Sequence, residues 1–224
     1  MLENASDDEG VVDMLRRLTN DVVAISVVLG VGGCATGGGV GACNVEYPKQ
    51  ISSNYVLPWT VGETYRVVNT NCGRGQTHNG LARFAYDFQM PVGTVIRASR
   101  AGTVIDVNDQ YADYNGTPGE ENWIFIRHDD GTVARYYHLT REGGLVEIGS
   151  EVASGQAIGF SGATGYIGWR KIPHLHFDVT EQECGTDFFG HLCETVPITF
   201  RNTRPHPTGL RDQEDYPALE LESE

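Results

Sequence analysis

Short runs of β-branched and aromatic residues, separated by turn signals, recur between residues 65 and 198. Glycine stands just before a β-branched pair at Gly93, Gly102 and Gly131, as expected where a turn leads into a strand. No window of this region shows sustained helical periodicity. The pattern therefore predicts an antiparallel all-β domain. We expect strands at residues 94–98, 103–107, 123–127, 132–138, 156–160 and 174–179.

The last of these runs carries two histidines on alternate residues, His174 and His176. Residues i and i+2 of a strand point to the same face, so both imidazoles would project into one space. Two imidazoles that converge on one point suit a divalent transition metal, and zinc above all. The alternative is a histidine pair on the solvent face of an ordinary strand, and the other motifs of the chain decide between the two.

Two further segments supply the other ligand types that a catalytic zinc site needs. One carries His78 and Asp87, and the other places His138 inside a strand-like aromatic run. Such a site takes three protein ligands from histidine and carboxylate and leaves a fourth position open for water. We predict that His78, Asp87 and His176 are the metal ligands. His138 and His174 would then lie beside the metal as acid/base groups.

The remaining histidines are not expected to bind metal. These are His128, His191 and His206, which lie in polar, turn-like contexts. We expect His128 to be solvated.

The order of these motifs resembles the lysostaphin-like, LytM-type zinc endopeptidases, which cut peptidoglycan peptides. The resemblance covers roughly residues 60 to 200 and extends beyond the histidines to residues 86–94, 122–131 and 159–165. The sequence departs from the family pattern in one place. The best-known members separate the first histidine and the aspartate by three residues, whereas eight lie between His78 and Asp87 here. A longer loop can still return to the same metal, because ligands need to converge only in space.

The resemblance implies a compact antiparallel two-sheet β domain of the barrel-sandwich hybrid type, with the metal in a groove across one sheet. It also implies one Zn²⁺ per chain and hydrolysis of the peptide cross-links of bacterial peptidoglycan. A zinc ion so held would lower the pKa of its water to about 7 and polarise the scissile carbonyl. Residues 109–121 are polar and turn-rich and are expected to flank the groove, where their aromatic side chains either contact substrate or cover the sheet edge.

Residues 1–33 are predicted to be an export signal. A run of apolar and small residues, 22–33, is about half the length needed to span a bilayer. Arg16 and Arg17 precede it, as a secretory signal requires. Met14 would make a better start of such a signal than Met1. The alternative is a buried apolar helix in a cytosolic protein.

The run ends with one apolar and two small residues directly before Cys34. This pattern resembles the lipobox of bacterial lipoproteins. The resemblance implies that Cys34 is lipidated and attaches the protein to a membrane facing the periplasm. Ala35 after the cysteine lacks the aspartate that retains many lipoproteins at the inner membrane, so we expect the outer membrane rather than the inner.

The other four cysteines form an even set, which fits an oxidising compartment. Four cysteines permit three pairings. Cys184 with Cys193 would close a short loop, which leaves Cys43 with Cys72, but the sequence alone does not establish the pairing. None of them has Cys-x-x-Cys spacing, so a structural zinc site is not expected.

The formal net charge of -14 argues against a nucleic-acid partner, which would select a basic surface. Much of the acidity lies at the two ends of the chain, which are expected to be solvated and flexible. The predicted organisation is therefore an export signal, a glycine-rich tether, a zinc peptidase domain and an acidic tail: residues 1–33, 34–56, 57–201 and 202–224.

Two readings without catalysis remain open. One is an inactive LytM-type module that binds and activates a murein amidase. The other is a β-sheet binding lipoprotein whose histidines are incidental. The full candidate ligand set favours an enzyme, with peptidoglycan peptides, the membrane and an envelope regulatory protein as the expected partners.

Overall fold

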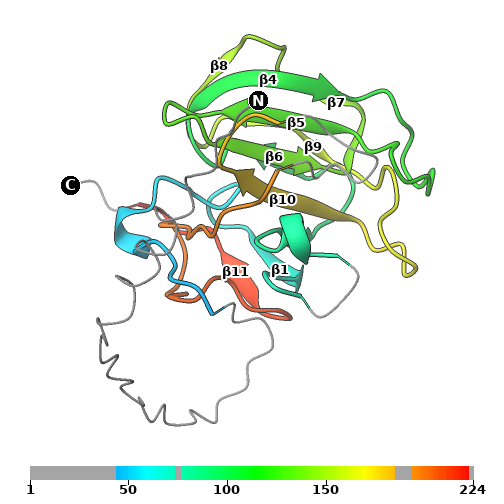
Figure 1. Ribbon diagram of the computed structural model, residues 1–224. Helices are drawn as coiled ribbons and strands as arrows, with labels where there is room; N and C mark the ends of the chain where they lie inside the picture. The colour runs from blue at the N-terminus through cyan, green and yellow to red at the C-terminus, as the bar shows by residue number, and fades with distance from the viewer. Residues whose placement is uncertain (1–43, 74–76, 185–192, 222–224) are drawn as a thin grey trace, which may run out of the picture. The chain divides into compact units, whose positions relative to one another are not determined.

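The structure, a computed structural model, describes residues 44–73, 77–184 and 193–221 (Figure 1). These residues form eleven strands and two short 3-10 helices, η1 (Gln50–Ser52) and η2 (Gly80–Ala82), with no α-helix among them. No helix in this part of the chain is long and apolar enough to cross a bilayer. The prediction of an all-β fold is confirmed.

The strands form two antiparallel sheets. The larger sheet contains β1 (Thr64–Asn69), β2 (Tyr86–Gln89), β4 (Gly102–Asn108), β5 (Trp123–Arg127), β6 (Val133–Tyr137), β8 (Glu151–Val152), β10 (His174–Thr180) and β11 (Asp215–Pro217). The smaller sheet contains β3 (Val95–Arg97), β7 (Leu139–Gly144) and β9 (Ala157–Ser161). The strand orders are β11-β1-β2-β10-β6-β5-β4-β8 and β3-β9-β7. Figure 1 shows β10 in the middle of the larger sheet, between β6 and the region of β1 and β11.

Six strands coincide with the predicted runs to within one residue at each end: β3, β4, β5, β6, β9 and β10. The sequence pattern did not predict the other five. β8 contains only two residues, which is too short for an alternating pattern to develop.

β10 is buried along its whole length because both of its faces are covered. Leu175, Phe177 and Val179 point into the main hydrophobic core, where Phe88 of β2 and Phe200 also lie. Each such apolar side chain stabilises the fold by about 1.5–3 kcal/mol when it is fully buried. The alternate residues of β10 point to the opposite face, and that face carries the histidines.

The strand register fixes the neighbours of those histidines. On β2, Asp87 lies opposite His176 and Gln89 lies opposite His174. On β6, Tyr137 lies opposite His176. Cross-strand partners point to the same face of a sheet, so Asp87 is delivered directly to the histidine face.

Residues 202–221 are not the flexible acidic tail that their composition predicted. β11 pairs with β1 at the edge of the larger sheet. Leu210, Tyr216 and Ala218 are buried in the main core, the last two with 2% and 1% of their surface exposed. Apolar residues spaced between the acidic ones supply enough burial to fold this segment. The predicted domain boundary at residue 201 therefore lies inside the folded domain.

The described part of the predicted tether, residues 44–56, also packs on the domain. Tyr47, Tyr55 and Val56 are buried. The amide of Gln50 donates to the carbonyls of Phe200 and Thr203. The prediction of a free tether is wrong for these residues, because their apolar side chains and this amide find partners on the domain.

Several predictions fall outside the described residues. They concern the export signal, residues 34–43 of the tether, the anchor residue Cys34, and His191.

Cys184 and Cys193 form a disulfide, which confirms one of the candidate pairs. Cys72 is also disulfide-bonded. Cys43 lies outside the described residues, so its pairing with Cys72 remains a prediction.

Candidate metal centre

The three predicted ligands converge on one point on the histidine face. Asp87 Oδ1 lies 2.9 Å from His176 Nδ1 and 3.0 Å from His78 Nε2. The two imidazole nitrogens are 3.3 Å apart. One ligand atom from each of the three residues falls within 4.8 Å of the others, and all three residues are buried. These residues are far apart along the chain, and the β2–β10 register and one loop bring them together.

His78 reaches the site from the loop between β1 and β2, in spite of the eight residues before Asp87. Its backbone is in the left-handed region, with φ of 56°, a conformation that non-glycine residues adopt mainly at turns and functional sites. Its Nδ1 lies 3.3 Å from the carbonyl oxygen of Thr70. When Nδ1 donates to that carbonyl, the lone pair of Nε2 points at the other two ligands.

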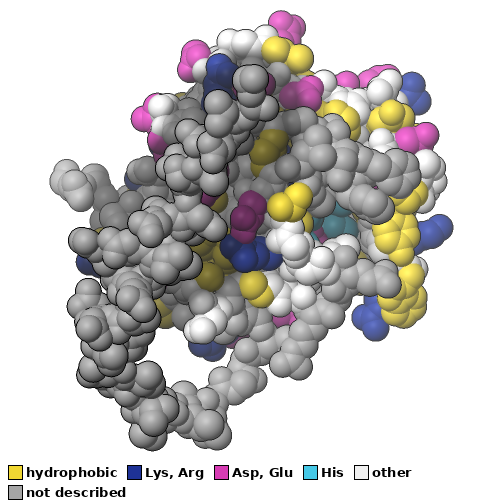
Figure 2. All heavy atoms as spheres, in the orientation of Figure 1, with side chains coloured by type: hydrophobic (Ala, Val, Ile, Leu, Met, Phe, Trp, Pro, Cys, Tyr) yellow, Lys and Arg dark blue, Asp and Glu magenta, His cyan; other side chains and the backbone are white. Residues whose placement is uncertain are grey.

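The donor set fits a zinc ion. Two imidazole nitrogens and one carboxylate oxygen are the usual protein ligands of a catalytic zinc site with an open fourth position. The side chains of His176 and Asp87 remain 10% and 12% exposed, so a water or a substrate atom can reach the ligand atoms. On the face drawn in Figure 2, histidine side chains are visible in a recess flanked by hydrophobic side chains.

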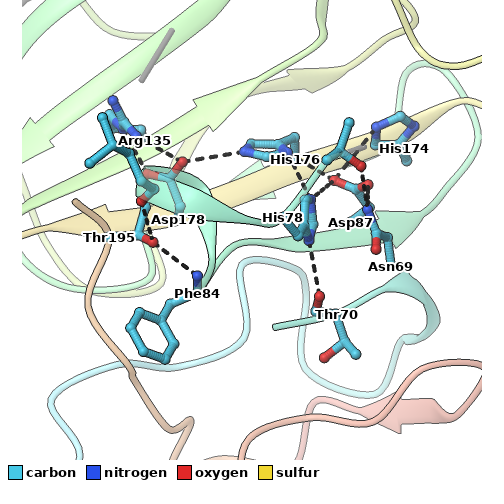
Figure 3. A network of polar contacts seen from close by, with 12 residues as sticks. Asn69, Thr70, His78, Phe84, Asp87, Arg135, His174, His176, Asp178 and Thr195 are labelled. Carbon is cyan, nitrogen blue, oxygen red and sulfur yellow. Dashed lines mark hydrogen bonds and ion pairs between the residues drawn. The ribbon is translucent and has the colours of Figure 1, made fainter. Parts of the chain in front are cut away.

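A second layer of residues holds the ligands. The amide of Asn69 on β1 donates to Asp87 Oδ2 at 3.1 Å, which leaves Oδ1 directed at the two imidazoles. Asp178 Oδ2 lies 3.3 Å from His176 Nε2 and orients that ring from behind. Histidines that bind metal ordinarily make such a hydrogen bond through the other ring nitrogen. Figure 3 shows Asp178 between Arg135 and His176.

The fully buried carboxylate of Asp178 is paired with Arg135 of β6. Arg135 Nε and Nη2 donate to the two carboxylate oxygens at 2.6 and 3.0 Å. Burial raises the pKa of Asp178, but the Arg135 charge and the hydrogen bond to His176 outweigh it and hold this pKa well below its usual value. Sequence reasoning missed both residues. A signal was present, since Asp178 continues the alternation of His174 and His176 on the same face of β10.

The surroundings also set the protonation of the site without metal. Burial lowers the pKa of His176, but its hydrogen bonds to Asp178 and Asp87 raise this pKa to about 9. Burial raises the pKa of Asp87, whereas the charges of His78 and His174 take it well below its usual value. A proton on His176 therefore has to leave before Nδ1 can bind a metal.

His138 and His174 lie beside the ligand cluster, as predicted. Their ring centroids are 4.7 Å apart, and His174 Nε2 lies 3.7 Å from Asp87 Oδ1. His138 Nδ1 lies 2.7 Å from the carbonyl oxygen of Thr164, and His174 Nδ1 lies 2.8 Å from that of Ile172. When each Nδ1 donates to its carbonyl, each ring keeps Nε2 free to move a proton.

His138 is the single residue between β6 and β7, where the chain passes from the larger to the smaller sheet. Its φ is 62°, a second left-handed backbone at this site. Burial, together with the nearby charges of His174 and His176, lowers the pKa of His138 to about 3. The imidazole of His138 is therefore neutral near pH 7.

Two of the other histidines are structural. His128 is buried, contrary to the expected solvation, and its Nδ1 lies 2.8 Å from the carbonyl oxygen of Ala101. The aromatic ring of Tyr55 packs edge-on against it. His206 is buried as well, and its Nε2 accepts a hydrogen bond from the backbone of Phe200. The group of described residues that could hold a metal ion is His78, Asp87 and His176.

The predicted flanking loop, residues 109–121, supports the site from outside. The Tyr114 backbone donates to Ala163, and Asn115 accepts a hydrogen bond from the Gly165 backbone. Thr164, between those two residues, carries the carbonyl that holds His138. The loop thus braces the turn on which His138 depends. The Tyr114 side chain is half exposed, so contact with substrate stays a prediction.

Comparison with known proteins identifies relatives of this arrangement. Residues 81–187 match the model of Peptidase family M23. The chain is 35% identical over 102 residues to the peptidoglycan DD-endopeptidase ShyA of Vibrio cholerae, which is 46% of this chain and 20% of that protein. It is also 35% identical over 100 residues to lysostaphin of Staphylococcus simulans, which is 44% of this chain and 18% of that protein. The chain thus spans about a fifth of the length of these two relatives.

A solved structure, the catalytic domain of lysostaphin from Staphylococcus simulans, is similar with 26% identity and a TM-score of 0.39. The alignment covers 55% of this chain and 83% of that domain. The family match and the 35% identity to lysostaphin confirm the predicted resemblance to lysostaphin-like peptidases. The family match includes Asp87, His138, His174 and His176 but begins after His78.

Proposed function

We propose that this chain, whose residues 81–187 form a Peptidase family M23 domain, is a zinc-dependent endopeptidase that hydrolyses the peptide cross-links of bacterial peptidoglycan. One observation carries the proposal. The ligand atoms of His78, Asp87 and His176 meet within 4.8 Å of one another, and two more imidazoles lie beside them. A binding module whose histidines were incidental would not need this convergence.

The residues of the chain divide the chemistry between them. A zinc ion held by His78, Asp87 and His176 would supply a Lewis acid that polarises a carbonyl and lowers the pKa of a water to about 7. We assign the acid/base role to His138, whose Nε2 would accept the proton of the attacking water and return it to the leaving amine. His174, when it carries a proton on Nε2 as well as on Nδ1, would donate from Nε2 to the oxygen on which charge develops. The Nδ1 contacts with Ile172 and Thr164 hold the two rings in place for these roles.

The side-chain chemistry supports an amide rather than a glycosidic bond as the target. Glycan cleavage ordinarily uses two carboxyl groups that flank the sugar bond. The buried carboxylates of this site are otherwise engaged, Asp87 with the histidines and Asp178 with Arg135. The relatives named above include an enzyme described as a peptidoglycan DD-endopeptidase, which supports wall peptides as the substrate.

Digestion of purified sacculi tests the reaction. We expect muropeptides without cross-links to appear only when zinc is present, with the glycan strands left whole, as identified by mass spectrometry. The net charge of -14 weakens the encounter with an anionic wall, so the digestion is run with and without envelope partner proteins. Release of reducing sugars, or no product under either condition, would contradict the proposal. Stimulation of a murein amidase without any cleavage would instead support the inactive module.

We further propose that the protein is a periplasm-facing lipoprotein anchored through Cys34, at the outer membrane rather than the inner. The arginine pair, the apolar run and the small residues before Cys34 support this location. Replacing Cys34 by serine is expected to give an uncleaved or soluble form that no longer incorporates a fatty-acid analogue. Fractionation of cells that express the wild type and the variant measures this, and unchanged membrane attachment of Cys34→Ser would show that another segment is the anchor.

A further inference from the structure

A hollow of about 430 Å³ opens beside His174, where β1 begins and β2 ends. Its walls include Pro173, the residue before His174, and Gln89, the cross-strand partner of His174. Arg66 of β1 and Asp215 of β11 form its far side. None of the roles assigned above uses this hollow.

The strand register places three side chains of the hollow, those of Gln89, Arg66 and Asp215, on the same face of the sheet as the metal ligands. His174 lies opposite Gln89, Gln89 opposite Arg66, and Arg66 opposite Asp215. Neighbouring strands are about 4.8 Å apart, so Arg66 lies roughly 10 Å from His174. An extended peptide covers about 3.3–3.6 Å per residue, so a substrate held at the metal reaches Arg66 within about three residues.

The hollow presents one positive and one negative group side by side. Arg66 Nε and Nη2 donate to the two carboxylate oxygens of Asp215 at 2.8 and 3.1 Å. The two side chains are 48% and 51% exposed, so the ion pair contributes little to stability. Nη1 of Arg66 and further lone pairs of Asp215 stay available to a ligand. The amide of Gln89 makes no hydrogen bond to any residue that the structure describes, so it too can bind a ligand.

These groups suit a ligand that carries both charges. A lone carboxylate near Arg66 would also meet the negative charge of Asp215, and a lone ammonium would also meet Arg66. A group with a carboxylate beside an ammonium satisfies both at once. We propose that this hollow is a specificity subsite for a substrate residue whose side chain ends in an ammonium and a carboxylate. The proposal rests on the proposed peptidase function.

β1 and β11 lie outside the residues that match the family. The charged side of the hollow is therefore built by β1 and by the C-terminal segment that pairs with it, and the rest by residues within the family match.

Calorimetric binding of two synthetic peptides tests the proposal on the full chain loaded with zinc. Both contain one diamino-dicarboxylic acid residue, either with its side-chain ammonium and carboxylate free or with the two groups acetylated and amidated. Each peptide is recovered and checked by mass spectrometry. We expect the free form to bind about tenfold more tightly, and Arg66→Gln and Asp215→Asn each to remove most of that preference.

Two controls separate recognition from structure. Arg141→Gln removes another exposed arginine, on β7 of the smaller sheet, and is expected to keep the preference. The double variant Arg66→Asp with Asp215→Arg restores an ion pair between β1 and β11 but exchanges the two charges. We expect it to melt like the wild type and to lose the preference.

Equal affinity of the wild type for the two peptides would overturn the subsite, as would an equal loss of preference in Arg141→Gln. The readout is binding and not turnover, so the two proposals can fail separately. A preference for the free form without any digestion of sacculi would leave the subsite standing and contradict the peptidase. Digestion of sacculi without a preference for the free peptide would support the peptidase and contradict the subsite.

Discussion

Chelator-washed protein is expected to take up about one zinc ion per chain, and His176→Ala and Asp87→Ala are each expected to abolish that binding. Asp87 Oδ1 is the atom shared by both imidazoles, and it is the only charged ligand, so its loss removes the attraction as well as one donor. With two of three protein ligands left, the site no longer matches a catalytic zinc centre, and hydrolysis is expected to disappear with the metal. Metal analysis after dialysis measures the first effect.

The affinity for zinc is also expected to depend on pH. In the protein without metal, the pKa of His176 is raised to about 9, so a proton must leave when zinc binds. The apparent affinity should then fall by about tenfold for each pH unit below 9 and level off above it. His128→Ala, a buried histidine outside the cluster, serves as the matched control and should keep its zinc. Zinc content like that of the wild type in both ligand variants would refute the site.

His138→Asn is expected to keep zinc and to lose about 10²–10⁴-fold in kcat, the usual contribution of a positioned general acid/base. Asparagine is the better replacement here because the backbone φ of 62° favours a residue that tolerates the left-handed region. His138 is held by Thr164 and not by the cluster atoms, so its loss should leave the three ligands in place. The effect should fall on kcat and leave metal content unchanged.

The matched measurement is His174→Ala, which removes the other imidazole of the pair. If His138→Asn instead releases the metal while His78→Ala retains it, the roles of ligand and base have to be exchanged. The two outcomes are separated by metal analysis of the same samples that are used for the rates.

The sequence predicted the residues of the metal centre more completely than it predicted the domain boundaries. Strand geometry alone puts His174 and His176 on one face of the strand. The β2–β10 register then places the carboxylate of Asp87 opposite His176. His78 could not be placed by spacing, because a loop sets its position and loops follow no period. Asp178 was readable from the same alternation, whereas Arg135, its partner, depends on a β6–β10 pairing that no local pattern specifies.

The C-terminal segment shows why composition misleads at a boundary. Asp212, Glu214 and Asp215 give it the charge of a disordered tail. Tyr216 and Ala218 follow these charges two residues apart, at strand spacing, and two such residues do not stand out in a compositional window. The prediction that His128 is solvated was wrong for a related reason. The turn that follows it suggested solvent, whereas in the fold Tyr55 packs against the ring and Ala101 lies at its Nδ1.

The pairing of β1 with β11 has a consequence for how the chain matures. The partners Arg66 and Asp215 are 149 positions apart, so one edge of β1 stays open until almost all of the domain has left the ribosome. Contacts at such separation form slowly, and an open strand edge invites association with other chains. A domain that is completed from its last strand is poorly suited to folding during synthesis.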